Sequence, residues 1–153
     1  GVKKSLHHAE YILEIRERID LLNEKSERKW GKMNPAQMMN HCTKILKVAT
    51  GKVILSNPNI LFKAVGIFTK MEMGVLNNGI PRNMPTFEAV LCEGDCNFAE
   101  TKANLLSELD EYLELYKNKK LPKSHPLFGN MSEKQWGFME YKHLDHHLKQ
   151  FGL

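Results

Sequence analysis

Apolar residues recur every three to four positions along four long stretches of this chain, which is the spacing of one face of an α-helix. In the first stretch this pattern predicts a helix from Leu6 to Glu27 with Ser5 as its N-cap. Its apolar stripe consists of His8, Ile12, Ile15, Ile19 and Leu22. The third stretch predicts a helix from Asn97 to Lys117. Its buried face is expected to hold Phe98, Leu105, Leu109, Tyr112 and Tyr116.

The second and fourth stretches begin with the strongest local signals. Asn34 and Ser132 are residue types that cap helices, and each is followed three positions later by a glutamine, Gln37 or Gln135, that completes a capping box. The fourth helix is expected to end at Gly152, and the second at Gly51. The apolar stripe of the second helix consists of Met38, His41, Cys42, Ile45 and Ala49.

The connection between the second and third helices is long and carries its own pattern. Asn57-Pro58 can start a shorter apolar helix that reaches Met73, and residues 77–85 are typical of a loop. Strict alternation of apolar and polar residues, the mark of a strand, is not sustained anywhere. The pattern therefore predicts an all-α fold in which residues 1–153 form one domain, with an accessory helix in the long crossover.

Composition and charge exclude several classes of function. The chain has 153 residues, of which 42% are hydrophobic and 26% charged, as in an ordinary globular domain. The net charge of +4 is mild and the lysines are spread along the chain, which argues against a nucleic-acid partner. No apolar run approaches the ~20 residues that cross a bilayer, so no membrane role is expected.

The three cysteines are an odd number and indicate no disulfide framework, which favours a reducing cytoplasm. Cys92 and Cys96 do not have the Cys-x-x-Cys spacing of a redox pair, so a redox role is not favoured. Cys42 follows His41 directly and is interpreted as a small core residue close to a candidate pocket. The sequence does not define a role for any of the three.

The last helix carries the most informative chemistry. His143 and His147 are four residues apart and therefore lie on one face, where two imidazoles can bind one metal ion from the same side. On a helical wheel His146 falls towards the edge of that face. The other residues of the face are Trp136, Glu140, Leu144 and Phe151.

The position of His41 along its helix gives a second test. His41 lies ~10 Å from the start of the second helix, and the midpoint of His143 and His147 lies ~9 Å before the end of the fourth. If these two helices are antiparallel with level ends, the three rings meet at one height. If they are parallel, the rings miss by ~10 Å, which is too far for one ion. A three-histidine site therefore requires the antiparallel arrangement.

Such a site would suit a divalent transition metal, because neutral imidazole binds Zn, Ni, Cu or Fe(II). Three protein ligands leave positions open for water or substrate, which is typical of catalytic sites. A bound metal lowers the pKa of a water or a thiol and makes it nucleophilic. Glu140, one turn before His143, is the candidate catalytic residue, as a base or as a hydrogen-bond acceptor behind a ligand.

The alternative is that these histidines only pack in the core, where buried imidazoles are ordinarily hydrogen-bonded. Spacing alone leaves both interpretations open. Of the other histidines, His8 is expected at the boundary of the core and well over ~15 Å from the site. His7 and His125 are expected on the surface or in loops.

Several motifs resemble the DinB/YfiT-like superfamily, and the resemblance covers nearly the whole chain, most weakly between Ile54 and Leu91. The run from Tyr141 to Gly152 is the most specific and is similar to a DinB-like subfamily of bacterial proteins. The other segments that carry the resemblance are Trp30-Gly31-Lys32-Met33, Gln37-Met38-Met39-Asn40-His41, His125-Pro126-Leu127-Phe128-Gly129 and Trp136-Gly137.

The resemblance implies a four-helix bundle in up-down-down-up order, with a long crossover between the second and third helices. It also implies a metal held by His41, His143 and His147. Characterised members of the superfamily are similar to thiol transferases or related isomerases, many members have no assigned activity, and relatives are often dimers. Glu140 is not part of the superfamily's pattern.

Together these observations give a functional hypothesis. The protein is expected to use a three-histidine Zn, Ni or Fe site to activate a thiol or water for attack on a small electrophile, as a thiol S-transferase or a hydrolase would. Its expected partners are a small-molecule substrate, in particular a low-molecular-weight thiol, and a second copy of the chain as a homodimer. The alternative is a helical bundle that binds metal without turnover or has a purely structural role.

Overall fold

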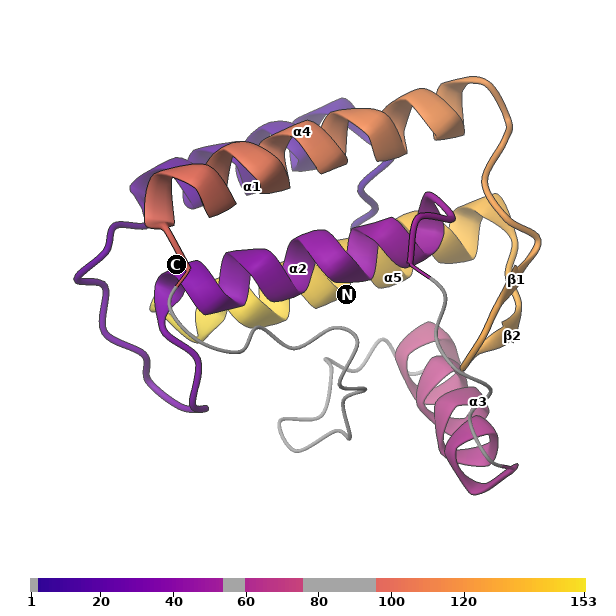
Figure 1. Cartoon of the computed structure of the whole chain (residues 1–153). Coiled ribbons are helices and arrows are strands. Elements are labelled where there is room, and N and C mark those ends of the chain that lie inside the picture. The colour runs from indigo at the N-terminus through magenta and orange to yellow at the C-terminus, as the bar shows by residue number, and fades with distance from the viewer. Residues whose placement is uncertain (1–2, 54–59, 76–95) are drawn as a thin grey trace.

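The computed structural model describes residues 3–53, 60–75 and 96–153 (Figure 1). This part of the chain is mostly helical, as the apolar pattern predicts. Its helices are α1 (Ala9–Leu21), α2 (Pro35–Ala49), α3 (Ile60–Val75), α4 (Phe98–Lys117) and α5 (Glu133–Lys149). A small antiparallel pair of strands, β1 (Ser124–His125) and β2 (Gly129–Asn130), lies between α4 and α5.

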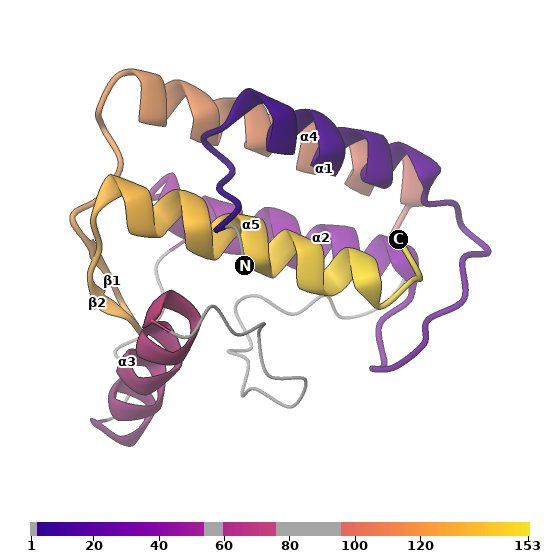
Figure 2. The ribbon, with the colours of Figure 1, turned by 180° about the vertical axis from the view of Figure 1, so that it is seen from behind.

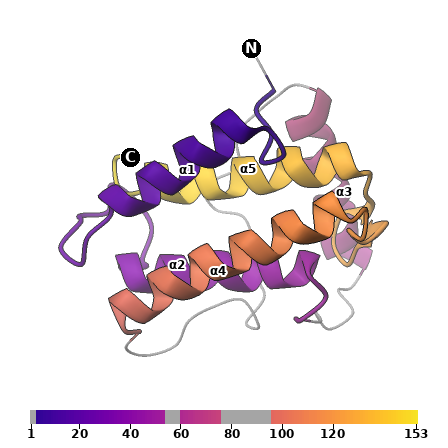
Figure 3. The same cartoon turned by 90° about the horizontal axis from the view of Figure 1, so that it is seen from above.

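The helices α1, α2, α4 and α5 lie in two layers. α1 and α4 lie side by side in one layer, α2 and α5 lie side by side in the other, and α4 lies over α2 (Figures 1 and 3). α1 and α5 run in one direction and α2 and α4 in the other (Figure 2). α2 and α5 are therefore antiparallel, which is the condition that a three-histidine site imposes.

The core between the two layers is built from the apolar stripes of all four helices. In α4, Tyr112 is buried as predicted, whereas Phe98 and Tyr116 are only partly buried. The largest fully buried side chains are Trp136, Tyr112, Leu6, Ile15, Ile19, Met38, Met39, Leu46, Met73, Leu105, Leu109 and Leu144.

Both predicted capping boxes are confirmed. The side chain of Asn34 accepts a hydrogen bond from the backbone of Gln37 at 2.8 Å, and Gln37 Oε1 accepts one from the backbone of Asn34 at 2.9 Å. Ser132 and Gln135 make the same exchange at the start of α5. These caps set where α2 and α5 begin, and hence the height of every histidine along them.

The prediction for the first helix is too long at both ends. α1 begins at Ala9 after an extended His8, and Ser5 is not its cap, because Ser5 Oγ instead accepts a hydrogen bond from the backbone of His7. Leu6 leaves the helical path to donate its N–H to Gly137 O at 2.9 Å. At the other end, Asn23 turns the chain by accepting from the backbone of Lys25.

The strand pair between α4 and α5 was not predicted, because two-residue strands are too short to show a period. His125 organises the turn: its Nδ1 accepts from the backbone N–H of Leu127 at 2.9 Å and of Phe128 at 3.2 Å. Gly129, with φ +72°, supplies a left-handed conformation that favours glycine.

The accessory helix predicted from Asn57-Pro58 to Met73 corresponds to α3, which begins at Ile60 and ends at Val75. Its predicted start lies outside the described residues. α3 packs beside the strand pair, where Lys70 Nζ donates to Asn130 O at 2.8 Å (Figure 1).

Candidate metal centre

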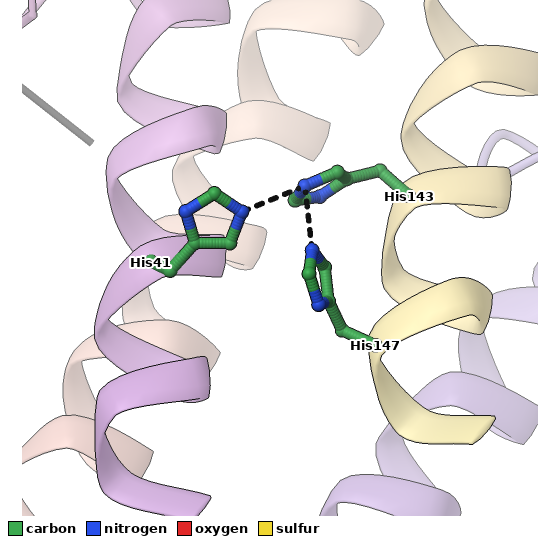
Figure 4. A group of neighbouring side chains, drawn as sticks. All are labelled: His41, His143 and His147. Atoms are coloured by element: carbon green, nitrogen blue, oxygen red, sulfur yellow. Dashed lines mark hydrogen bonds between the residues drawn. The ribbon is translucent and has the colours of Figure 1, made fainter. Parts of the chain in front are cut away.

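Two helices supply the three histidines that sequence analysis singled out. α2 supplies His41, and α5 supplies His143 and His147 from consecutive turns. His41 and His147 are only 5% and 8% exposed, and His143 is half-buried. All three side chains point into the space between the two helices (Figure 4).

The Nε2 atoms of the three rings converge on one another, with His143 in the middle. Its Nε2 lies 3.1 Å from Nε2 of His41 and 3.2 Å from Nε2 of His147 (Figure 4). One donor atom from each ring lies within 4.8 Å of the other two. Metal–nitrogen bonds of ~2.0–2.1 Å place two ligand nitrogens on one ion ~3–3.4 Å apart. The three histidines are therefore close enough to hold a metal ion.

The protonation of His147 is set by a fourth side chain. Its Nδ1 lies 2.8 Å from Oε1 of Gln150, and because a carbonyl oxygen only accepts, Nδ1 carries the proton and donates. A neutral His147 then presents a lone pair at Nε2, towards His143. Sequence analysis missed Gln150, although its position three residues after His147 on the same helix was a usable signal.

Three neutral rings cannot satisfy both Nε2 contacts at once. Since His147 Nε2 has no proton, His143 accepts from His41 or donates to His147, but it cannot do both through one nitrogen. His143 Nδ1 is buried and has no hydrogen-bond partner among the described residues. A cation between the rings would give every converging lone pair a partner. This is the strongest reason to regard the three nitrogens as a metal-binding set.

Burial and mutual repulsion keep the rings neutral. Burial, followed by the charges of His147, His41 and His146, lowers the pKa of His143 well below its usual value. Burial and His41 lower the pKa of His147 to about 3, against a smaller opposing effect of the Gln150 hydrogen bond. Neutral imidazoles are the form that binds metal, so no proton has to be displaced at neutral pH.

Comparison with known families finds one match. The family described as "Protein of unknown function (DUF1569)" matches residues 2–152. The chain belongs to DUF1569. Searches of the curated proteins and of the solved structures found no match. All three histidines of the centre lie within the part of the chain that matches DUF1569.

Glu140, the candidate catalytic residue of this DUF1569 protein, lies in the core. It is 4% exposed, and its Oε2 has no hydrogen-bond partner among the described residues. Burial raises its pKa to about 8, so it is protonated at pH 7. In its ionised form, its charge adds to the effect of burial in raising the pKa of Cys42 and of Tyr112. This protonated form fits a proton donor at neutral pH, whereas the predicted role as a base requires a lower pKa.

Cys42 is a core residue, as interpreted from the sequence: it is 1% exposed, and its Sγ contacts Met38 Sδ at 3.7 Å. Burial raises the pKa of its thiol, which keeps it unreactive. Cys96 is disulfide-bonded, contrary to the expectation of no disulfide. Cys92 lies outside the described residues.

His7 lies in the turn before α1, in agreement with its predicted place in a loop, whereas His125 lies in the short strand β1; both side chains are half-buried and take part in the packing. The His7 ring stacks on Tyr116 with a centroid distance of 3.7 Å, and its Nε2 lies 2.8 Å from the hydroxyl of Tyr112. His125 holds the turn between β1 and β2 and packs on Trp136. Burial lowers the pKa of each to about 4. His8, expected at the boundary of the core, is exposed.

A cavity of about 460 Å³ lies between α1 and α5. Its lining includes Arg18 from α1 and Lys142, Asp145 and Lys149 from the face of α5 that the helical wheel sets opposite the ligands. Arg18 and Lys149 both pair with Asp145 there. This cavity is therefore on the other side of α5 from the histidine centre.

None of the helices in the described part of the chain combines the length and the apolar character that a bilayer crossing requires.

Proposed function

We propose that this protein is a metal-dependent enzyme that activates a thiol or a water for attack on a small electrophile. The observation that carries the proposal is the convergence of three Nε2 atoms from two antiparallel helices, with separations of 3.1 and 3.2 Å around His143. His41, His143 and His147 would hold a divalent Zn, Ni or Fe ion. Three ligands are the number that leaves a position open for a reactant.

The arrangement of the helices supports the same proposal. The helices form two layers, α1 with α4 and α2 with α5, and the chain direction of α1 and α5 is opposite to that of α2 and α4. This arrangement fits a four-helix bundle in up-down-down-up order with α3 in the crossover (Figures 1 and 3). This order is the one that the resemblance to the DinB/YfiT-like superfamily implies, and it supports our proposal that the protein belongs to that superfamily. We also propose a homodimeric protein whose substrate partner is a low-molecular-weight thiol.

Each residue of the centre would have a separate role in this reaction. The bound metal would lower the pKa of a coordinated thiol or water, so that it is ionised at neutral pH. The histidines hold their Nε2 lone pairs towards one point, and His147 is fixed in this form by Gln150. Glu140, which is protonated because it is buried, is the candidate general acid that would donate a proton to a leaving group.

The first experiment measures whether the protein binds a metal ion. Protein purified without chelator and without a metal-affinity step is analysed for elements, and then titrated with Zn²⁺, Ni²⁺ and Fe²⁺ by calorimetry. We expect one ion per chain and a rise in melting temperature that chelator reverses, because an ion that binds only the folded state stabilises it. The absence of saturable binding of all three metals would refute the metal site.

The second experiment measures turnover. Metal-loaded protein is mixed with a panel of low-molecular-weight thiols and an aryl halide or an epoxide, and the loss of free thiol is followed. Loss faster than with the His143→Ala variant supports a thiol transferase. Hydrolysis of the electrophile in the absence of thiol would indicate activation of water instead.

The alternative function is metal binding without turnover, or packing alone. The burial of His41 and His147, at 5% and 8% exposed, favours it because little of either ring meets solvent. Metal binding with no turnover across the panel would support storage or sensing. No metal binding, with a stable fold, would leave the histidines as packing residues.

A further inference from the structure

Gln150 is placed to act on the centre without touching its converging nitrogens. It is the C-cap of α5, its backbone N–H donates to His146 O and His147 O, and it is 7% exposed. Its side chain folds back over the last turn so that Oε1 accepts from Nδ1 of His147 at 2.8 Å. A buried side-chain amide in this position has little freedom to turn away.

The loop between α1 and α2, residues 22–34, holds Gln150 from outside. The backbone N–H of Lys29 donates to Gln150 O at 2.6 Å. Gly31 has φ +86°, and a Cβ built on it would lie 3.0 Å from Nε2 of Gln150. A glycine at this position therefore lets the loop lie against the side-chain amide of Gln150, while Lys29 holds its backbone.

We infer that Gln150 is a positioning residue for the metal centre, which orients the ring of His147 and fixes its tautomer so that Nε2 presents a lone pair. The inference rests on the proposed metal site and deepens it. An acceptor behind a histidine ligand fixes the ring and raises its basicity, and loss of such a partner typically costs ~10–100-fold in metal affinity. His143, whose Nδ1 has no such partner among the described residues, lacks this support.

The first test needs no metal. Nitrogen-15 NMR of the histidine rings in the chelator-treated protein distinguishes a protonated Nδ1 from a protonated Nε2. For His147 we expect the Nδ1–H form in the wild type and in Gln150→Glu, which keeps an acceptor. In Gln150→Met, which has a similar size but no acceptor, we expect a mixture of tautomers. Nε2–H as the main form in the wild type would overturn the inference, whether or not the protein binds metal.

The second test measures the affinity for Zn²⁺ by competition with a chromogenic chelator, and the visible spectrum of the Co²⁺-loaded protein. Gln150→Met is expected to weaken Zn²⁺ binding ~10–100-fold and to change the Co²⁺ spectrum, while Gln150→Glu binds at least as tightly as the wild type. Lys149→Met, an exposed neighbour at the same helix end, is the matched control and should bind normally. Circular dichroism verifies that each variant is folded.

The outcomes separate the two proposals. If the wild type binds no metal, the proposed function fails, and the NMR experiment still decides whether Gln150 sets the tautomer. If the wild type binds Zn²⁺ and Gln150→Met binds it equally well, the metal site stands and the role of Gln150 in it is refuted.

Discussion

His143 occupies the middle of the histidine cluster, since its Nε2 is the atom that both other rings approach. Its neutral form leaves one contact unsatisfied, and its Nδ1 is buried without a partner among the described residues. The same position makes it the candidate ligand whose removal should disrupt the centre most completely.

We therefore expect His143→Ala to abolish stoichiometric binding of Zn²⁺ while keeping the helix content of the wild type. Elemental analysis after metal loading measures the bound Zn²⁺, and far-ultraviolet circular dichroism measures the helix content. His8→Ala removes an exposed histidine outside the cluster and serves as the control with unchanged metal content. Unfolding of His143→Ala would instead assign the residue a structural role.

Glu140 gives a second prediction for a single residue. Burial raises its pKa in the folded protein to about 8, from 4.5 in the unfolded chain. Between these values the folded state binds the proton and the unfolded state does not, so stability falls as pH rises. From pH 6.5 to 8 we expect the free energy of unfolding to fall by about 1–2 kcal/mol.

Urea denaturation in the presence of chelator measures this fall, and Glu140→Gln should remove it, because the amide does not titrate. The slope with pH is the readout, so a constant difference in stability between the two proteins does not affect the conclusion. Equal slopes for both proteins would mean that Glu140 is ionised in the fold.

Among the helices of the described part of the chain, α5 combines a strong start signal with two of the three candidate ligands. The Ser132–Gln135 capping box fixes its first turn, and the ligands lie two to three turns further along. Whether the first turn contributes only to stability or also to the position of the ligands can be separated experimentally.

Ser132→Ala removes the hydrogen bond to the backbone of Gln135 and should lower the free energy of unfolding by about 1 kcal/mol. Ser132→Thr keeps an acceptor and should cost less. The affinity for Zn²⁺ is expected to be unchanged in both, since the ligands are held by packing in the middle and at the end of α5. Weaker metal binding in Ser132→Ala at unchanged stability would show that the helix start positions the site.

For the whole molecule, the buried histidines predict sensitivity to acid. Burial lowers the pKa of His7 and His125 to about 4, below the 6.5 of an unfolded histidine. Between those values the unfolded chain binds more protons than the folded one, so stability falls as pH drops from 6.5 to about 4. The pKa values of His143 and His147 in the histidine centre are lowered as well.

Urea denaturation between pH 4 and pH 7, with chelator present, should show this loss. His7→Phe keeps a ring to stack on Tyr116 and removes one titrating group, so its stability should depend less steeply on pH than that of the wild type. A variant that follows the wild-type profile would indicate that His7 is not held neutral by the fold.

The local sequence was sufficient to predict those features that depend only on residues close together along the chain. Asn34 and Ser132 set the starts of α2 and α5 through hydrogen bonds within the first turn, and the end of α4 at Lys117 was also as predicted. The 3.6-residue period placed His143 and His147 on one face of α5. The antiparallel relation of α2 and α5 was a condition that the three-histidine hypothesis imposed, and the structure meets it (Figure 2).

Other features depend on contacts between distant residues, which no local pattern records. Leu6 lies outside α1 because its N–H bonds to Gly137 O, and His7 is half-buried because its ring packs on Tyr112 and Tyr116. The short strands were missed because two residues cannot show an alternation, and the turn between them is held by hydrogen bonds to His125 Nδ1. The carboxyl of Glu140 is protonated at pH 7 because the packed core removes water from it.

The sequence by itself determined the candidate ligands, because residue type and helical period are properties of short segments. Only the tertiary structure decided that His41 comes within 3.1 Å of His143, and that Gln150 stands behind His147. The physical reason is that a ring-to-ring distance between α2 and α5 depends on how the two helices pack, which the whole core determines.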